Sequence, residues 1–446
     1  MKEQGLYDRV TSRIARLGAR LGWNVRADRL FYWGRKSGLA ILDQGLFSGA
    51  NFLSNIVLAR WLTSAEYGAF AVAFAVFLFL SGFHNALLLE PMSVLGPSRY
   101  FQKIEAYLSA QVRLHFTLTL PLALFLTLTG LFLQIRQDVP EMAGALLGSG
   151  LALPLILLPW TVRRMFYVLK RPKNAMITSV FYALFLGASL GGMHLYGLDS
   201  SFAALLSLGL ASLLSSVLTG VGLLAQHGND VSLSWWEILK AHWDYGKWIV
   251  AAAILGVASG QFQTLFLAGS LNLESAGMFR AMQNFMLPMA QAVTAIATLG
   301  LPALSYDYGR GDLRSLRRKG LFITLALTGG AIIYAIFLWI FALPIERLVY
   351  AGKYSTFAWM IPLLTLVPVF TAAATGPSLV LRTYRPQIHL IGGAVQAVVS
   401  LSTTILLVKI WGVGGAAISL VLTYLAVFVF TVYLYRIWCL SYEAKE

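Results

Sequence analysis

Charged residues are scarce in this 446-residue chain: Asp, Glu, Lys and Arg make up 12% of it, against roughly 25% in soluble domains. Hydrophobic residues make up 58%. A water-soluble core cannot bury so many apolar side chains. The composition therefore excludes a soluble globular protein and indicates a chain that lies mostly within a lipid bilayer.

Cysteine and the common metal-binding and nucleotide-binding motifs are also missing. The single cysteine, Cys439, excludes an internal disulfide and a metal site built from several cysteines. His115, His194 and His389 are scattered, without the spacing of a metal site. No phosphate-binding loop of the form G-x-x-x-x-G-K-[ST] occurs. We therefore expect no metal, no cofactor and no ATP hydrolysis by this chain.

The chain is strongly basic, with a net charge of +15. A basic balance can indicate a nucleic-acid partner. In a protein with many membrane spans, however, it usually records an excess of Lys and Arg in the cytoplasmic loops. We therefore expect no nucleic acid among the partners.

Apolar stretches recur along the chain, and each is long enough to cross a hydrocarbon core of roughly 30 Å as a helix. They predict twelve transmembrane helices, at 38–61, 68–90, 113–133, 143–169, 175–196, 202–226, 247–271, 277–304, 320–342, 357–381, 387–411 and 415–437. If the N-terminus is cytoplasmic, the outer segments hold only Arg136, Arg347, Lys353 and Lys409. This asymmetry predicts a multi-pass membrane protein with both termini in the cytoplasm.

The first 37 residues are basic. Arg9, Arg13, Arg16 and Arg20 recur every three or four residues, with apolar residues between them. This pattern predicts an amphipathic helix that lies on the anionic inner leaflet. A disordered basic tail is the alternative.

The two halves of the chain resemble each other. The segment LARWLTSAEYGAF at 58–70 aligns with LAGSLNLESAGMF at 267–279, and LKRP and YGL have counterparts LRTYRP and WGV in matching places. A duplicated all-α membrane protein follows, with two six-helix bundles around a central cavity. The expected segments are 1–37 (basic amphipathic), 38–226 (first bundle), 227–246 (cytoplasmic linker), 247–437 (second bundle) and 438–446 (cytoplasmic tail).

Polar side chains follow helical spacing in two of the predicted spans. The first face, in span 38–61, consists of Gln44, Ser48, Asn51 and Asn55. The second face, in span 277–304, consists of Arg280, Gln283, Asn284 and Gln291. Polar groups in lipid are costly and tend to face a cavity, so we expect these faces to bind substrate. Hydrogen bonding between helices is the alternative for the Asn and Gln residues.

Other polar residues near these faces complete the candidate set. We add Arg60, His84, Asn85 and Gln263 as substrate-binding residues. Arg60 and Arg280 can instead reach the lipid headgroups, and His84 can be a satisfied interior histidine. Asp43 lies beside the first face and is a candidate for ion coupling, or else it pairs with Lys36 or an inner-loop Arg.

One stretch carries a resemblance to a known family. The run at 58–71 has the pattern L-A-R-x-L-x-x-x-E-Y-G-x-F-A, and N-A-L-L-L-E-P-M follows at 85–92. This region resembles the Wzx-like polysaccharide exporters of the MOP superfamily, relatives of the MATE drug exporters and of the lipid II flippases. The motifs cover about the first quarter of the chain, and the span number and the repeat agree over the rest.

The resemblance implies a V-shaped pair of six-helix bundles with a central cavity that opens alternately to the two sides. It implies a flippase of the bacterial inner membrane whose cargo is an oligosaccharide linked to undecaprenyl diphosphate, for exopolysaccharide or O-antigen synthesis. Arg60 and Arg280 suit a diphosphate, because guanidinium groups bind phosphate in a bidentate manner. The implied partners are this lipid, anionic membrane lipids, a polysaccharide polymerase and glycosyltransferases.

Two other function classes stay open on the sequence. A MATE-type ion-coupled antiporter for drugs or metabolites needs an acidic residue deep in the first bundle, for which Asp43 is the nearest candidate. A membrane glycosyltransferase or O-antigen ligase needs charged groups on sizeable outer loops, and the predicted outer loops are short. We therefore expect a transporter and not an enzyme.

Overall fold

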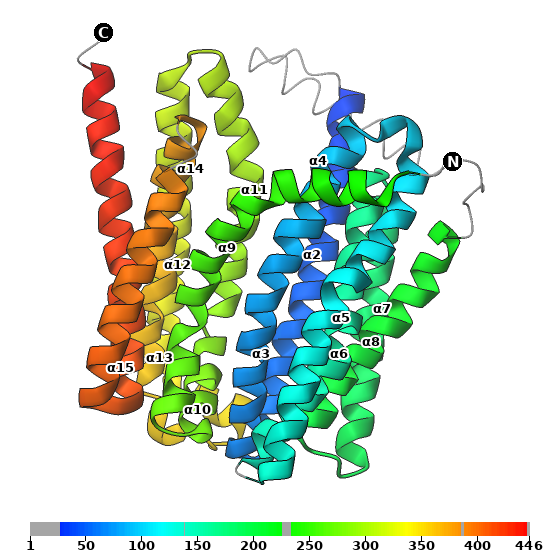
Figure 1. Ribbon diagram of the computed structural model, residues 1–446. Helices are drawn as coiled ribbons and strands as arrows, with labels where there is room; N and C mark the ends of the chain where they lie inside the picture. The colour runs from blue at the N-terminus through cyan, green and yellow to red at the C-terminus, as the bar shows by residue number, and fades with distance from the viewer. Residues whose placement is uncertain (1–26, 138, 225–232, 385–387, 444–446) are drawn as a thin grey trace, which may run out of the picture.

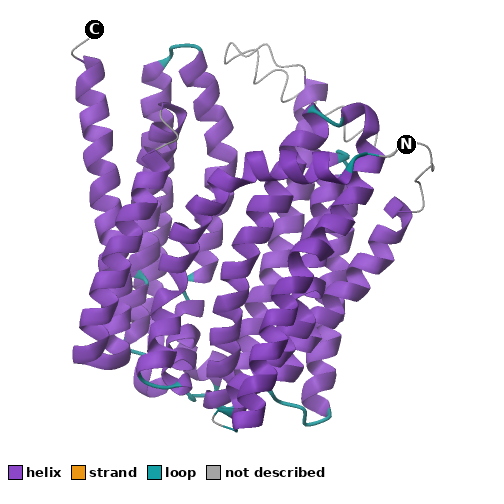
Figure 2. Ribbon diagram, in the orientation of Figure 1, coloured by secondary structure: helices purple, strands orange, loops and turns teal. Residues whose placement is uncertain are grey.

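The computed structural model describes residues 27–137, 139–224, 233–384 and 388–443 (Figure 1). These residues form helices joined by short loops, and the described part contains no strand (Figure 2). The first half holds α2 (Ala27–Trp61), α3 (Ser64–His84), η1 (Asn85–Leu89), α4 (Glu90–Ser98), η2 (Phe101–Lys103), α5 (Ile104–Arg136), α6 (Pro140–Val168), α7 (Pro172–Leu195) and α8 (Ser201–Leu224). The second half holds α9 (Trp235–Ser270), α10 (Leu273–Asn284), α11 (Leu287–Gly309), α12 (Leu313–Tyr350), η3 (Ser355–Phe357), α13 (Met360–Leu364), α14 (Leu366–Tyr384) and α15 (Ile388–Glu443).

Eight stretches of helix in the described residues are long and apolar enough to cross a membrane. One of them contains two of the predicted spans, because α15 joins 387–411 and 415–437 across a break at Gly412. The backbone of Gly412 has φ 55° and ψ −131°, which a residue with a side chain rarely adopts. The glycine therefore lets the chain reverse direction without a loop.

Several predicted spans are divided or extended in the structure. Span 68–90 is part of a continuous helix that runs from α3 through the π-helix η1 into α4. Span 277–304 is divided into α10 and α11 at Phe285 and Met286, and span 357–381 into α13 and α14 at Thr365. Apolar run length predicts that a segment crosses the membrane, but it does not locate the break within it.

The helices of each half pack mainly on one another. In the first bundle (α2 to α8), α5 packs on α6, α6 on α8, and α2 on α7. In the second bundle (α9 to α15), α14 packs on α12 and α15, and α9 on α15. Small residues permit this closeness, as at Gly150, where an added Cβ would lie 2.7 Å from the backbone nitrogen of Thr127.

The outer surface of the bundles is apolar. On α5 the exposed large side chains include Leu120, Leu124, Phe125, Leu128 and Phe132. A soluble protein rarely exposes so extensive an apolar surface, whereas lipid tails surround it without cost. The exposed faces of the helices therefore identify the surface that contacts lipid.

The two ends of the molecule differ. We call the end with the loops at 99–103 and 310–312 the basic end, and the end with Thr63, Asn272 and Gly412 the opposite end (Figure 1). The predicted amphipathic segment lies outside the described residues for 1–26, while 27–37 is helical and continuous with α2. The predicted orientation, with the basic end in the cytoplasm, stays a prediction.

The predicted linker 227–246 is described only from residue 233 onward. Its described part is not a separate element, because α9 begins at Trp235 and continues into the second bundle. Figure 1 shows the first part of α9 lying across the basic end of the first bundle. Glu237 pairs there with Arg99 at 2.9 Å, and the His242 Nε2 lies 2.8 Å from the Tyr107 hydroxyl. The connection between the bundles is thus anchored on the first one.

Candidate functional site

A buried ion pair lies inside the first bundle, near its basic end. Asp43 of α2 is fully buried and accepts hydrogen bonds from Nε and Nη2 of Arg163 on α6, at 3.0 Å and 2.8 Å. The hydroxyl of Tyr167 donates to the same carboxylate at 2.6 Å, and the hydroxyl of Ser179 on α7 donates to its other oxygen. Both carboxylate oxygens are therefore occupied, and the charge is neutralised.

The ring of Phe47 closes this cluster on one side. The Arg163 guanidinium lies 4.2 Å from its centroid, and the ring stacks on Tyr182 of α7 at 4.7 Å. For Asp43 the sequence offered pairing with Lys36 or an inner-loop Arg, and the structure shows the partner to be Arg163, near the end of span 143–169. Its position inside an apolar span was the signal in the sequence that could have identified it.

The first polar face turns its amides toward its own bundle. Asn51 donates to the Phe47 carbonyl at 2.8 Å and accepts from the Tyr182 hydroxyl at 2.9 Å. Asn55 is buried and donates to the Asn51 carbonyl at 2.9 Å. Gln44 is exposed and donates to Ser48 at 3.1 Å. Gln44 is thus the most exposed residue of this face, and the binding roles of Gln44, Asn51 and Asn55 stay predictions.

The second polar face is divided by the break between α10 and α11. Asn284 is buried at the end of α10 and donates to the hydroxyls of Tyr67 and Tyr350, at 3.1 Å and 3.2 Å. Gln283 is buried beside it, whereas Gln291 is exposed on α11. The face predicted as continuous therefore lies on two helices with different surroundings.

The remaining predicted residues lie in three separate places. The His84 Nε2 lies 3.0 Å from the His115 Nδ1 in the core of the first bundle, and Asn85 begins η1 beside it. Gln263 is buried in the second bundle and donates to Ser400 on α15 at 3.0 Å. Arg60 is exposed in the last turn of α2. The structure does not bring these residues together into one pocket in this state.

The two bundles meet at the opposite end. Lys353 and Tyr354, after α12, both reach the last turn of α2: the Lys353 ammonium donates to the carbonyl oxygens of Ala59 and Leu62, and the Tyr354 hydroxyl to that of Ala59. These carbonyls lie at a helix C-terminus, where they lack helical partners and where a cation is favourable. We call this contact, together with the Asn284 to Tyr67 hydrogen bond, the clasp.

Helices α3 and α10 touch closely beside the clasp. A Cβ at Gly68 would lie 1.9 Å from the carbonyl oxygen of Leu273, and one at Gly277 would lie 2.8 Å from the backbone nitrogen of Gly68. Arg280 follows on α10, with its guanidinium 5.3 Å from the Phe74 ring centroid. Its Nε is buried and has no hydrogen-bond partner in the described part of the chain. The bundles are therefore in direct backbone contact at this end.

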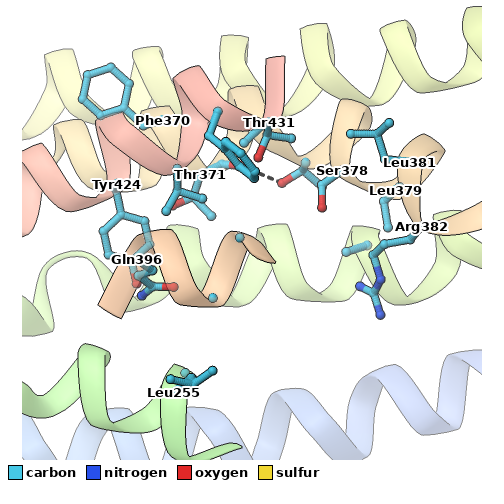
Figure 3. Close-up of a pocket in the computed structure, with 18 residues that line it drawn as sticks. Leu255, Phe370, Thr371, Ser378, Leu379, Leu381, Arg382, Gln396, Tyr424 and Thr431 are labelled. Carbon is cyan, nitrogen blue, oxygen red and sulfur yellow. Dashed lines mark hydrogen bonds between the residues drawn. The ribbon is translucent and has the colours of Figure 1, made fainter. Parts of the chain in front are cut away.

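A cavity of about 320 Å³ lies inside the second bundle, between α9, α11, α14 and α15 (Figure 3). One face of α14 lines it with residues spaced four, three and four apart: Thr371, Thr375, Ser378 and Arg382. Gln396 and Tyr424 of α15 line it as well, and Leu255 and Gly256 of α9 lie at its border. None of the site residues predicted from the sequence lines this cavity. The polar residues that share one face of α14 could have indicated it, but the sequence analysis did not identify them.

These features define an all-helical membrane protein of two bundles that meet at one end. No protein-family model and no curated protein matches the sequence. Solved structures of similar fold include a multidrug resistance MATE family transporter of the MOP superfamily in an inward-facing conformation. It has a TM-score of 0.69 and 14% identity, covering 88% of this chain and 94% of that one.

Two further solved structures have the same fold. The lipid II flippase MurJ, in an inward closed conformation, has a TM-score of 0.68 and 12% identity over 90% of this chain and 86% of its own. A MOP superfamily transporter from Pyrococcus furiosus has a TM-score of 0.56 and 15% identity, over 90% and 95% of the two chains. The predicted fold class, all-α and MATE/MOP-like, is confirmed, while the narrower polysaccharide-exporter family stays a prediction.

The buried ion pair makes a first testable prediction. Asp43→Asn leaves the Arg163 guanidinium buried without a counter-charge, so the free energy of unfolding should fall by about 3–5 kcal/mol. The double variant Asp43→Asn, Arg163→Gln should recover more than half of this loss, because neither charge remains. Thermal unfolding of the purified protein in detergent, followed by tryptophan fluorescence, measures both. An Asp43→Asn variant of unchanged stability would contradict the structural role and favour ion coupling.

The contact at Gly68 makes a second prediction. Gly68→Val should hold the opposite end open, because the new side chain would overlap backbone atoms of Leu273 that cannot rotate away. The distance between spin labels at Ala65 and Glu274 is measured in a Cys439→Ser background. The parent protein should show a population at short distance, and Gly68→Val should lose nearly all of that population. Gly49→Val on α2, where a Cβ meets nothing within 4 Å, is the matched control and should keep that distance. A short distance in Gly68→Val would show that the bundles do not close through this contact.

Proposed function

We propose that this protein is a flippase that moves a diphosphate-linked oligosaccharide, carried on undecaprenol, from the inner to the outer leaflet of the bacterial inner membrane. Transport proceeds by alternating access between the two bundles, with the basic end and both termini in the cytoplasm. The fold supports transport, since structures of the same fold are described as MATE transporters and as a lipid II flippase. The protein carries out no covalent chemistry on its substrate.

The distribution of charge is the observation that carries the choice of substrate. Asp43, the buried carboxylate of the first bundle, is neutralised by Arg163, so it offers no free negative charge to a cationic drug. Arg60 and Arg280 have no acidic partner among the residues that the structure describes. Cations without counter-charge near the space between the bundles favour an anionic substrate, and a diphosphate suits guanidinium groups.

The clasp contributes to the free energy that holds the two bundles together at the opposite end. It consists of four hydrogen bonds between the bundles, and such bonds contribute about 0.5–1.5 kcal/mol each. A sum of a few kcal/mol is within the range that substrate binding can offset, and the apolar packing between the bundles adds to it. The state described here is closed at the opposite end, which is the state expected to receive substrate from the cytoplasmic leaflet.

Reconstitution into liposomes tests the proposal. The probe is a polyprenyl-diphosphate-linked N-acetylglucosamine that carries a fluorophore on the sugar, added to both leaflets, with dithionite outside as an impermeant quencher. Liposomes with the protein should lose nearly all fluorescence, whereas empty liposomes should keep the inner-leaflet share. Arg280→Ala should slow the loss at least tenfold, and Arg280→Lys less, because an ammonium lacks the planar fork.

The control variant for this assay is Gly187→Ala, on an exposed face of α7 where a Cβ meets nothing within 4 Å. It should transport at the parent rate. A drug antiporter would give a different result. Its liposomes would show no protein-dependent loss of probe fluorescence but would accumulate a cationic dye such as ethidium in a pH gradient, and this result would overturn the proposal.

A further inference from the structure

The cavity of the second bundle borders a position that a large side chain occupies in the first bundle. Aligning Leu58 with Leu267 places Phe47 opposite Gly256. In the first bundle the Phe47 ring fills the space between α2, α6 and α7, stacked on Tyr182. In the second bundle a Cβ on Gly256 would meet nothing within 4 Å. The cavity therefore exists because a glycine stands where the first bundle has a phenylalanine.

The charges differ in the same way. Asp43 aligns with Ala252, so the second bundle has no carboxylate at the position where the first one neutralises Arg163. Arg382, on the helix of the second bundle that corresponds to α6, lies half-buried at one end of the cavity (Figure 3). It forms no ion pair within the described ranges, where Asp307 is paired with Lys319. The cavity thus ends at a cation that has no acidic partner in the part of the chain that the structure describes.

The rest of the lining is neutral and suited to a sugar. The hydroxyls of Thr371 and Thr375 donate to the carbonyls one turn earlier, at 2.8 Å and 2.7 Å, which leaves their oxygen atoms free to accept. Gln396 and Tyr424 supply an amide and a phenol, and Phe370 and Phe430 add aromatic faces. Hydroxyl groups of a sugar need such donors and acceptors, and its apolar face packs on aromatic rings.

The size of the cavity limits what it can hold. At about 320 Å³ it lies at the lower end of the range of ligand pockets, roughly 300–1,000 Å³. It has room for one sugar with its phosphate, and not for an oligosaccharide. The glycines at 392 and 393, which also border it, leave open space where a Cβ would lie.

We propose that this cavity binds a phosphorylated sugar, with the phosphate on Arg382 and the ring among Thr375, Gln396 and Tyr424. In the flippase proposed above, on which the identity of the lipid rests, this group is the sugar next to the phosphate, while the remaining sugars stay between the bundles. The second bundle is then the one that recognises the headgroup, and the first bundle, filled by Phe47 and its ion pair, is the rigid partner.

Binding to the full-length protein in nanodiscs tests the site. The probes are a short-chain polyprenyl-phosphate-linked glucose, the corresponding neutral polyprenyl glucoside, free glucose 1-phosphate and inorganic phosphate, with binding measured by microscale thermophoresis. The phosphorylated lipid should bind at least tenfold more tightly than the neutral one. Arg382→Gln should weaken its binding by about tenfold to a hundredfold, as for the loss of hydrogen bonds to a charged group, and Arg382→Lys less.

A second variant tests the shape of the cavity. Gly256→Phe should fill it, as Phe47 fills the equivalent space, and abolish binding at an unchanged thermal midpoint. Gly187→Phe, on the exposed face of α7, is the matched control and should bind as the parent does. If Gly256→Phe does not fold, Gly256→Val replaces it. Parent-like binding by both Arg382→Gln and the Gly256 variant, or equal binding of the neutral lipid, would overturn the proposed site.

The outcomes separate this site from the proposed flippase function. One outcome is that glucose 1-phosphate binds as tightly as the phosphorylated lipid and loses its affinity in Arg382→Gln. That result would support a sugar-phosphate site in the cavity and overturn the claim that its ligand is a lipid. Parent-like flipping by Gly256→Phe in the liposome assay, together with parent-like binding, would overturn the site while leaving the flippase function intact. Loss of both binding and flipping in that variant supports the two proposals together.

Discussion

The interior of a bilayer offers no water to satisfy polar groups, and the structure depends on this constraint. Every backbone donor and acceptor within the membrane needs a partner in the protein, so the described residues form helices. The hydroxyl side chains obey the same rule: Thr119 donates to the His115 carbonyl at 2.8 Å, and Thr371 to the Val367 carbonyl. Against this background the Arg382 guanidinium is informative, because no acidic residue pairs with it among those that the structure describes.

The two bundles use one scaffold for different purposes. In the first, Asp43, Arg163 and the Phe47 ring fill the interior and, through Ser179 and Tyr182, join α2, α6 and α7. A buried pair of this kind contributes little net stability relative to apolar packing, but removing one partner is costly, so it fixes the arrangement of the helices. In the second, Gly256 leaves the equivalent space empty. A lined polar cavity of this kind is expected to hold water or a ligand.

Contact between the bundles combines backbone contacts with apolar packing, because Phe70 of the first bundle and Phe279 of the second belong to one buried cluster. Lys353 binds carbonyls at the end of α2, and α3 and α10 approach through Gly68 and Gly277. Such backbone contacts are individually weak, whereas the apolar cluster buries side chains from both bundles. Separation of the bundles at the opposite end would therefore expose part of this cluster to water, at a cost in free energy that adds to that of the clasp.

The sequence by itself determined the class of the protein and the placement of its spans. Run length, charge asymmetry and helical spacing are local properties, so they predicted an all-helical membrane fold and identified which residues share a helical face. The repeat also emerged from local matches such as Leu58 with Leu267. Breaks such as those at Phe285 and Gly412 escaped prediction, because apolar composition continues through them.

Tertiary structure alone decided the partners of the polar residues. Spacing places Asp43 and Asn51 on or beside one face, but Arg163 and Tyr182 come from helices 120 and 131 residues away. Likewise, Asn284 is held between tyrosines of both bundles, which no pattern in its own helix indicates. The cavity beside Gly256 is a space and not a residue, so it exists only once four helices are packed around it. Which groups meet depends on helix packing, and helix packing is a non-local property of the chain.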